Sequence, residues 1–139
     1  MSTPPARPGQ TLGVLERTLA PWVLVAYAGA TWDWHPLHHD REAALAAGLP
    51  GVVVDGQLLG ALLAEQVMDW AGPRARLRSL SFRFGDLVLA GDTVRVSGRV
   101  VDVEPTDEGR HVTLAQRVEA AGRTAIDGAH AGVLLPPAG

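Results

Sequence analysis

Residues 30–40 carry the chain's densest group of ionisable and aromatic side chains, in the sequence Ala-Thr-Trp-Asp-Trp-His-Pro-Leu-His-His-Asp. This segment contains three of the five histidines, two of the four tryptophans and two carboxylates. Carboxyl and imidazole groups among aromatic rings are typical of proton-transfer sites, because burial moves pKa values toward neutrality. Pro36 disfavours a helix through the segment, so we expect a bent loop that presents Asp33 and His38 to one point.

The residues alone leave other interpretations of this loop open. Asp33 and His38 could form a salt bridge that only fixes a turn. The histidines and Asp33 could bind a metal, but their spacing matches no zinc motif and no distant His/Cys pair completes a site, so we expect no metal. Trp32 and Trp34 could line a pocket or simply pack the loop. We expect surface or structural roles for the four remaining candidates, His39, Asp40, His111 and His130.

The elements that must position this loop are predicted to be helices on both sides of it. Pro21 suits the first turn of a helix, and the apolar residues 22–28 continue it to Gly29. After the loop, Asp40 is expected to cap a short helix over residues 41–47.

A second helix after the loop is predicted to be the centre of the fold. Asp55 can cap it, its apolar stretch begins at Leu58, and Gly72 and Pro73 end it. Residues 58–64 are apolar on every side, so we expect this helix to be buried.

The rest of the chain has the two-residue period of β-strands. A short edge strand is expected over residues 13–19. In the second half, apolar residues alternate with polar ones, and a phase shift at Val100–Val101 indicates a bulge. Short turns between the strands favour antiparallel neighbours. The predicted fold is therefore α+β, with a curved antiparallel sheet wrapped around one central buried helix. Residues 1–10 are expected to be a disordered tail and residues 11–139 a single domain.

Composition limits the function classes. A chain of 139 residues with a formal charge of −3 gives no electrostatic reason to bind nucleic acid. No apolar run is long enough for a membrane span, and the N-terminus has no secretory-signal pattern. With neither cysteine nor lysine, thiolate and Schiff-base chemistry are excluded. We expect a cytoplasmic protein.

The chain after its tail resembles the MaoC-like, (R)-specific enoyl-CoA hydratases, which have the hotdog fold. The family signature runs small residue, Gly, Asp, any residue, Asn, Pro, aliphatic residue, His. Residues 31–38 read Thr-Trp-Asp-Trp-His-Pro-Leu-His, which places Asp33, Pro36 and His38 in register. The family's aliphatic pair followed by His-Gly-Met aligns with residues 53–57, with Gly56 in register.

This resemblance implies a lyase that interconverts an enoyl thioester and an (R)-3-hydroxyacyl thioester. In the family, the Asp and His hold a water molecule and shuttle its proton, which makes Asp33 and His38 the expected catalytic pair. The Gly56 N–H, at a helix start, would stabilise the enolate oxygen. The resemblance implies no cofactor, because CoA or acyl carrier protein is part of the substrate. It also implies a homodimer or larger hotdog assembly, which could be heteromeric.

The departures from the family signature concern the surroundings of this pair. Trp32 replaces the family's Gly, His35 its Asn, Asp55 its His and Gln57 its Met. An Asp beside the enolate site would oppose the developing charge unless it caps the helix, and we favour the cap. The residues expected near the substrate are Trp32, Trp34, His35, Asp55 and Gln57.

Three functions are compatible with these residues. The first is the hydratase or dehydratase described above. The second is a subunit of a heteromeric hydratase, with a modified or degenerate site, which the departures favour. The third is a hotdog acyl-thioesterase, which ranks last because it would not require the Asp-x-x-x-x-His arrangement with its proline. Arginines 74, 76 and 78 could bind carrier phosphates, but a solvated strand edge explains them better.

Overall fold

The computed structural model describes residues 5–137. In chain order its elements are β1 (Leu15–Thr18), α1 (Pro21–Thr31), the 3-10 helix η1 (Pro36–His38), α2 (Arg41–Ala46), α3 (Gly56–Ala71), β2 (Arg76–Ser81), β3 (Thr93–Thr106), β4 (Gly109–Ala120) and β5 (Arg123–Leu135).

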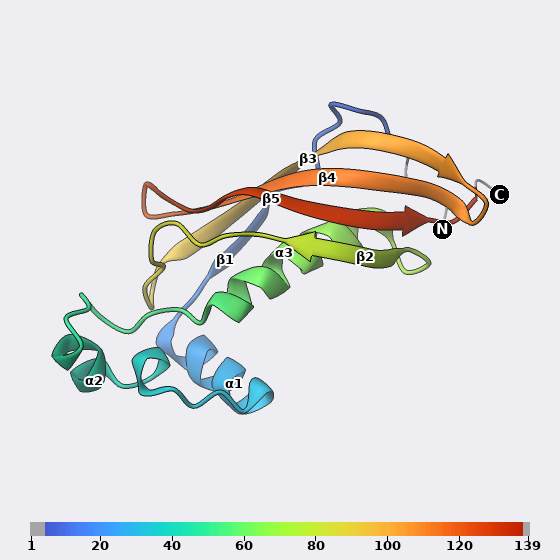
Figure 1. Cartoon of the computed structure of the whole chain (residues 1–139). Helices are drawn as coiled ribbons and strands as arrows, with labels where there is room; N and C mark the ends of the chain where they lie inside the picture. The colour runs from blue at the N-terminus through green and yellow to red at the C-terminus, as the bar shows by residue number, and fades with distance from the viewer. Residues whose placement is uncertain (1–4, 138–139) are drawn as a thin grey trace.

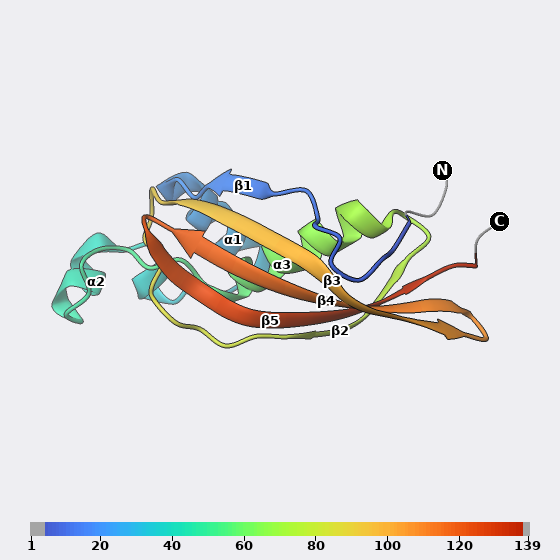
Figure 2. The same ribbon diagram turned by 90° about the horizontal axis from the view of Figure 1, so that it is seen from above.

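The five strands form one antiparallel sheet in the order β1-β3-β4-β5-β2. The sheet is curved, and α3 lies along its concave side (Figure 1). Figure 2 shows β1 and β2 at opposite edges of the sheet. This is the predicted architecture, and the order places the first two strands of the chain at the two edges.

Helix α3 forms the centre of the core. Leucines and a valine on α3 pack against inward-facing strand residues, of which Val94, Val96, Val118 and Ile126 are fully buried. The predicted burial of residues 58–64 holds except at Ala61, which is exposed, and at Ala64, which is half-buried. The helix therefore lies on the sheet rather than being enclosed on every side.

The strand details agree with the sequence pattern. Register between β3 and β4 shifts between Val100 and Asp102, which confirms the bulge. The tight turn from β4 to β5 uses Ala121 and Gly122, both with positive φ. Strand β2 ends at Ser81, and Phe84 rejoins the sheet only through an isolated bridge to Ile126.

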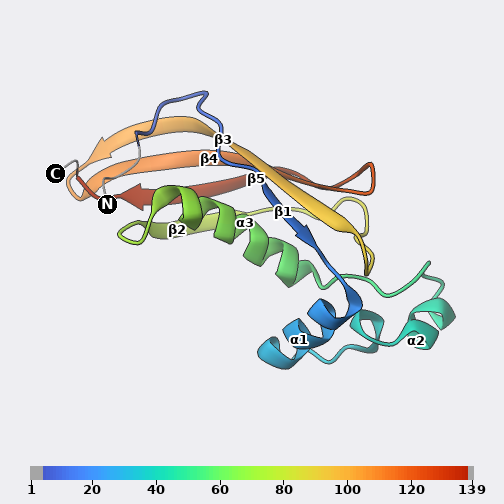
Figure 3. The same ribbon diagram turned by 180° about the vertical axis from the view of Figure 1, so that it is seen from behind.

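The two short helices and the loop between them lie at one end of the molecule, beyond the first turn of α3 (Figure 3). Asp40 Oδ1 accepts a hydrogen bond from the Ala43 N–H at 3.1 Å, which confirms the predicted cap of α2. This end of the molecule holds every residue of the candidate site.

Part of the segment assigned to the tail is held against β3. The Gly9 N–H donates to the Val100 carbonyl at 2.8 Å, and the Val100 N–H donates to the Gln10 carbonyl at 2.8 Å. Residues 1–4 lie outside the described residues. Within residues 5–137, no helix combines the length and apolar character needed to cross a membrane.

Candidate active site

The loop begins with a sharp reversal at the end of α1. Trp32 has φ 60° and ψ 26°, the left-handed conformation. The Asp33 N–H then donates to the Ala28 carbonyl at 3.1 Å. Glycine adopts this conformation most readily, which gives a physical reason for the Gly of the family signature.

His35 organises the turn that follows. Its backbone N–H donates to Asp33 Oδ1 at 3.3 Å, and its Nδ1 accepts a hydrogen bond from the Leu37 N–H at 3.3 Å. The imidazole thus caps η1, the single turn that ends at His38. His35 is exposed, and its contact with substrate remains a prediction.

His38 is held from the other side by the strand-like segment before α3. Its Nδ1 lies 2.8 Å from the Val53 carbonyl, and the Val53 N–H donates to the Leu37 carbonyl at 2.9 Å. A carbonyl only accepts, so Nδ1 carries the hydrogen. The other nitrogen, Nε2, is therefore the one that can take or give a proton.

Asp55 uses one carboxylate oxygen as a helix cap. Its Oδ1 accepts a hydrogen bond from the Gln57 N–H at 2.9 Å, which confirms the predicted cap of α3. The residue is only 8% exposed, and its Oδ2 is buried with no hydrogen-bond partner in the described chain.

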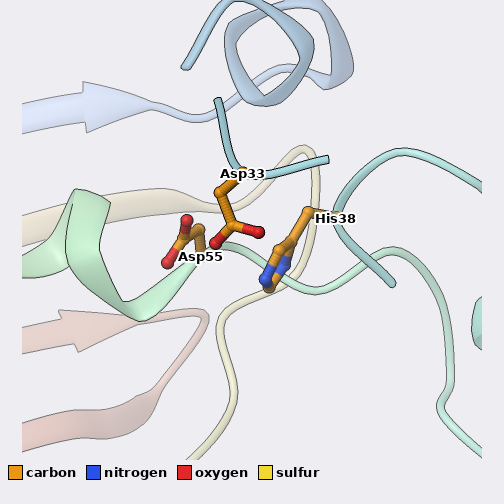
Figure 4. A group of neighbouring side chains, drawn as sticks. All are labelled: Asp33, His38 and Asp55. Carbon is orange, nitrogen blue, oxygen red and sulfur yellow. The ribbon is translucent and has the colours of Figure 1, made fainter. Parts of the chain in front are cut away.

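The side chains of Asp33, His38 and Asp55 lie next to one another (Figure 4). One potential ligand atom from each lies within 4.8 Å of the other two. The prediction that the loop brings Asp33 and His38 together is confirmed. A cation could be held by this set of donors, so the expectation of no metal stays a prediction.

A narrow pocket connects this cluster to apolar walls. It lies where α1 and the start of α3 approach each other, and its lining comprises Leu24, Tyr27, Ala28, Asp33, His38, Asp55 and Leu58. Apolar walls weaken competing hydration and strengthen electrostatic interactions inside the pocket.

Tyr27 is a member of the pocket that sequence reasoning missed. Burial raises the pKa of its phenol above the ordinary 10.0, and the negative charges of Asp55 and Asp33 add to the rise. The side chain is therefore a neutral hydrogen-bond donor at neutral pH. The sequence signal that could have found Tyr27 is its position six residues before Asp33, near the end of the preceding helix.

Gly56 has a free N–H at the start of α3. This N–H donates no hydrogen bond to any described residue, which is compatible with the predicted enolate-binding role. The structure adds a different reason for glycine: a Cβ here would overlap the ring of Phe84. Phe84 and Phe82 form an edge-to-face pair with ring centroids 5.5 Å apart.

The two loop tryptophans lie outside the pocket lining. Trp32 is 81% exposed and meets Trp34 edge-to-face, with ring centroids 6.3 Å apart. Trp34 also packs on Gly29 of α1. Gln57 is exposed on the first turn of α3. Substrate contacts of these three residues remain predictions.

The arginine group lies at the other end of α3. Arg78 forms an ion pair with Glu108 at 2.8 Å. Arg74 and Arg76 line a separate surface pocket with Glu108. A helix of this length spans about 24 Å, so the arginines are remote from the Asp33 cluster within this chain.

A MaoC-like domain model matches residues 4–121. The chain belongs to the MaoC-like dehydratase family. The resemblance seen in residues 31–38 and 53–57 is thereby confirmed, and this MaoC-like protein is placed in a family of hydratases and dehydratases. Its hotdog fold agrees with the solved structures of that family.

Two solved structures cover nearly all of this MaoC-like chain. The ChsH1-ChsH2 complex from Mycobacterium tuberculosis superposes with a TM-score of 0.84 at 30% identity, over 93% of this chain and 98% of that chain. The (R)-hydratase from A. caviae involved in PHA biosynthesis also gives 0.84, at 26% identity, over 94% and 97%.

Among curated relatives, the 3-oxo-4,17-pregnadiene-20-carboxyl-CoA hydratase beta subunit of Mycobacterium tuberculosis is 40% identical over 83 residues. The match covers 60% of this MaoC-like chain and 64% of the relative. The chain therefore spans less than two thirds of the relative that it matches.

Proposed function

We propose that this protein is a carbon–oxygen lyase that interconverts an enoyl thioester and an (R)-3-hydroxyacyl thioester. The supporting observation is the approach of the Asp33 carboxylate to the His38 imidazole, within 4.8 Å, in a chain of the MaoC-like family. The substrate carries its own CoA or acyl-carrier thioester, and the proposed reaction uses no further cofactor.

The chemistry follows from the two groups. In hydration, the water oxygen bonds to the β-carbon, and its proton passes to the Asp33–His38 pair. The pair returns a proton to the α-carbon, so its own protonation is restored. Nε2 of His38 is suited to this transfer because Nδ1 is fixed by Val53. The Gly56 N–H would stabilise the enolate oxygen formed between the two steps.

A second candidate is the same chemistry in a heteromeric hydratase. The similar proteins support it, because one is described as a beta subunit and another was solved as a ChsH1-ChsH2 complex. Since Asp33 and His38 are both present, this chain would supply the working pair in such an assembly. A homodimer of two hotdog domains is the simpler assembly.

A spectrophotometric assay tests the activity. Purified protein is incubated with crotonyl-CoA and with trans-2-decenoyl-CoA, and loss of enoyl absorbance is followed beside release of free thiol. We expect enoyl loss without thiol release. Thiol release alone would identify a thioesterase instead.

Variants of the pair test the mechanism. Asp33→Asn and His38→Ala should each lower kcat/KM by about 10²–10⁴-fold, the usual contribution of a positioned acid or base. His130→Ala, an exposed histidine on β5, is the matched control and should retain activity. Unaltered turnover in both pair variants would refute the proposed roles.

Sedimentation of the purified chain distinguishes the assemblies. A homodimer that is active by itself supports the first candidate. A chain that is inactive alone and gains hydratase activity with a second hotdog subunit supports the other.

A further inference from the structure

The buried oxygen of Asp55 is not explained by helix capping. The cap needs one acceptor, and Oδ1 supplies it to the Gln57 N–H. Oδ2 is buried and has no hydrogen-bond partner among residues 5–137, in a residue that is more than nine-tenths buried. A buried carboxylate oxygen that accepts no hydrogen bond is unfavourable, so a donor from a ligand is expected there.

The position of Asp55 indicates which donor. One of its carboxylate oxygens lies within 4.8 Å of a carboxylate oxygen of Asp33 and of a ring nitrogen of His38, and the three side chains are neighbours in Figure 4. A water molecule that attacks the β-carbon has two O–H groups. One gives its proton to the Asp33–His38 pair, and the other needs an acceptor if the oxygen lone pair is to point at the substrate.

We propose that Asp55 is a third catalytic group, whose Oδ2 accepts a hydrogen bond from the reacting water and, in dehydration, from the 3-hydroxyl. This inference rests on the proposed hydratase function. One O–H of the water donates to the Asp33–His38 pair and the other donates to Asp55 Oδ2, which fixes the direction of the oxygen lone pair. The residue that replaces the family's His thus joins the reaction instead of only starting the helix.

Tyr27 lines the same pocket as both carboxylates. The charges of Asp55 and Asp33 both act on its phenol. With two carboxylates and no arginine among the pocket residues, a hydrogen-bond donor between them relieves their mutual repulsion.

Asp55→Asn is the test, because asparagine keeps the size and can still cap α3 through its amide oxygen. It replaces the free Oδ2 by an NH₂ donor. We expect kcat to fall about 10- to 100-fold with little change in KM, as for loss of one hydrogen bond to a charged group. The thermal unfolding midpoint should stay unchanged.

Two further variants sharpen the comparison. Asp55→Ser also caps a helix but is too short to reach the water, so it should lose kcat as well. Asp40→Asn is the matched control, since Asp40 caps α2 in the same way and is exposed. Its kcat should equal that of the wild type.

The outcomes separate this inference from the function. In one outcome the wild type hydrates enoyl-CoA, Asp33→Asn is inactive, and both Asp55 variants keep full kcat. Asp55 is then only a helix cap, so the inference fails while the proposed function stands. A wild type that hydrates no enoyl thioester, in the assembly found by sedimentation, overturns both. Activity that is lost with EDTA and restored by a divalent cation also overturns the inference, because the three groups would then hold a cation.

Discussion

At the scale of single residues, Trp32 shows how this chain departs from its family. The end of α1 requires a left-handed backbone, and a non-glycine residue in that conformation costs about 1–2 kcal/mol. The indole recovers little of this within the chain, because it is 81% exposed. The loop is formed despite this residue, since His35, Val53 and Asp40 supply its hydrogen bonds.

Replacing Trp32 should therefore stabilise the protein. We expect Trp32→Gly to raise the free energy of unfolding by about 0.5–1 kcal/mol, measured by urea denaturation followed with circular dichroism. Trp32→Ala is the control, because it removes the same indole and keeps the strained backbone. A glycine variant no more stable than the alanine variant would contradict this explanation.

Tyr27 is the chain's only tyrosine and reports directly on the pocket. Its pKa is raised by burial and by the charges of Asp55 and Asp33, so its ultraviolet titration in the native protein should have a midpoint above 10.0. Asp55→Asn removes one negative charge and should lower that midpoint. It should remain above 10.0, because burial is the largest cause. An unchanged midpoint in the variant would place Asp55 too far from the phenol.

The same shift predicts a loss of stability in alkali. The unfolded chain releases the phenolic proton near pH 10, whereas the folded protein holds it to higher pH. Stability should thus fall as pH rises above about 10, and Tyr27→Phe should remove this part of the fall. Urea midpoints of the two proteins at pH 9 and at higher pH give the comparison. If the urea midpoints of both proteins fall equally with rising pH, Tyr27 is not the cause of the fall.

At the scale of elements, the first two turns of α3 are shaped by the rings that cover them. Gly56 and Gly60 are four residues apart and so share one face of the helix. Their missing side chains leave room for Phe84 and Phe82, since a Cβ at Gly60 would lie 2.8 Å from Cζ of Phe82. The glycine of the family motif, Gly56, thus allows the close approach of the Phe84 ring.

This contact can be measured by a double-mutant cycle. Gly60→Ala should destabilise the protein by about 1–3 kcal/mol, the usual effect of overpacking, because Phe82 is half-buried against the core. In a Phe82→Ala background the same change should have little effect or stabilise, because alanine favours a helix. Equal effects in both backgrounds would show that the ring is not the cause.

At the scale of the whole molecule, two buried glutamines join the helix to the sheet. Gln66 Nε2 donates to the carbonyls of Gly13 and Val96 at 2.8 and 2.9 Å. Gln116 Nε2 donates to the Leu63 carbonyl and to Gln66 Oε1, both at 2.9 Å. These bonds fix α3 against the strands, and the start of α3 in turn holds Asp55 and Gly56 beside the loop of residues 30–40.

Removing Gln66 should loosen this connection. Gln66→Leu removes the donor from two carbonyls and the acceptor from the Gln116 amide, and we expect a loss of about 1–3 kcal/mol in the free energy of unfolding. Gln57→Leu, on the exposed side of the same helix, should change stability by less than about 0.5 kcal/mol. Urea denaturation of both variants measures these two changes in the free energy of unfolding. Similar small effects would mean that the buried amides contribute nothing net.

Much of the fold could be predicted because its determinants are local. The caps at Asp40 and Asp55, the bulge near Val101 and the alternating strands depend on neighbours a few residues away, which the sequence displays directly. The same holds for Pro36, which bends the loop so that Asp33 and His38 can meet. The family signature then assigned this pair its expected chemistry.

Only the tertiary structure placed Asp55 and Tyr27 beside that pair. Their approach depends on packing between segments that are distant in the chain, through the bonds of His38 and Leu37 to Val53 and through α1 lying against the start of α3. A capping aspartate uses only one of its two oxygens, and the direction of the other is set by what packs around it. The sequence by itself predicted the Asp33–His38 pair, and the folding of α3 against the loop decided that a second carboxylate, that of Asp55, lies beside it.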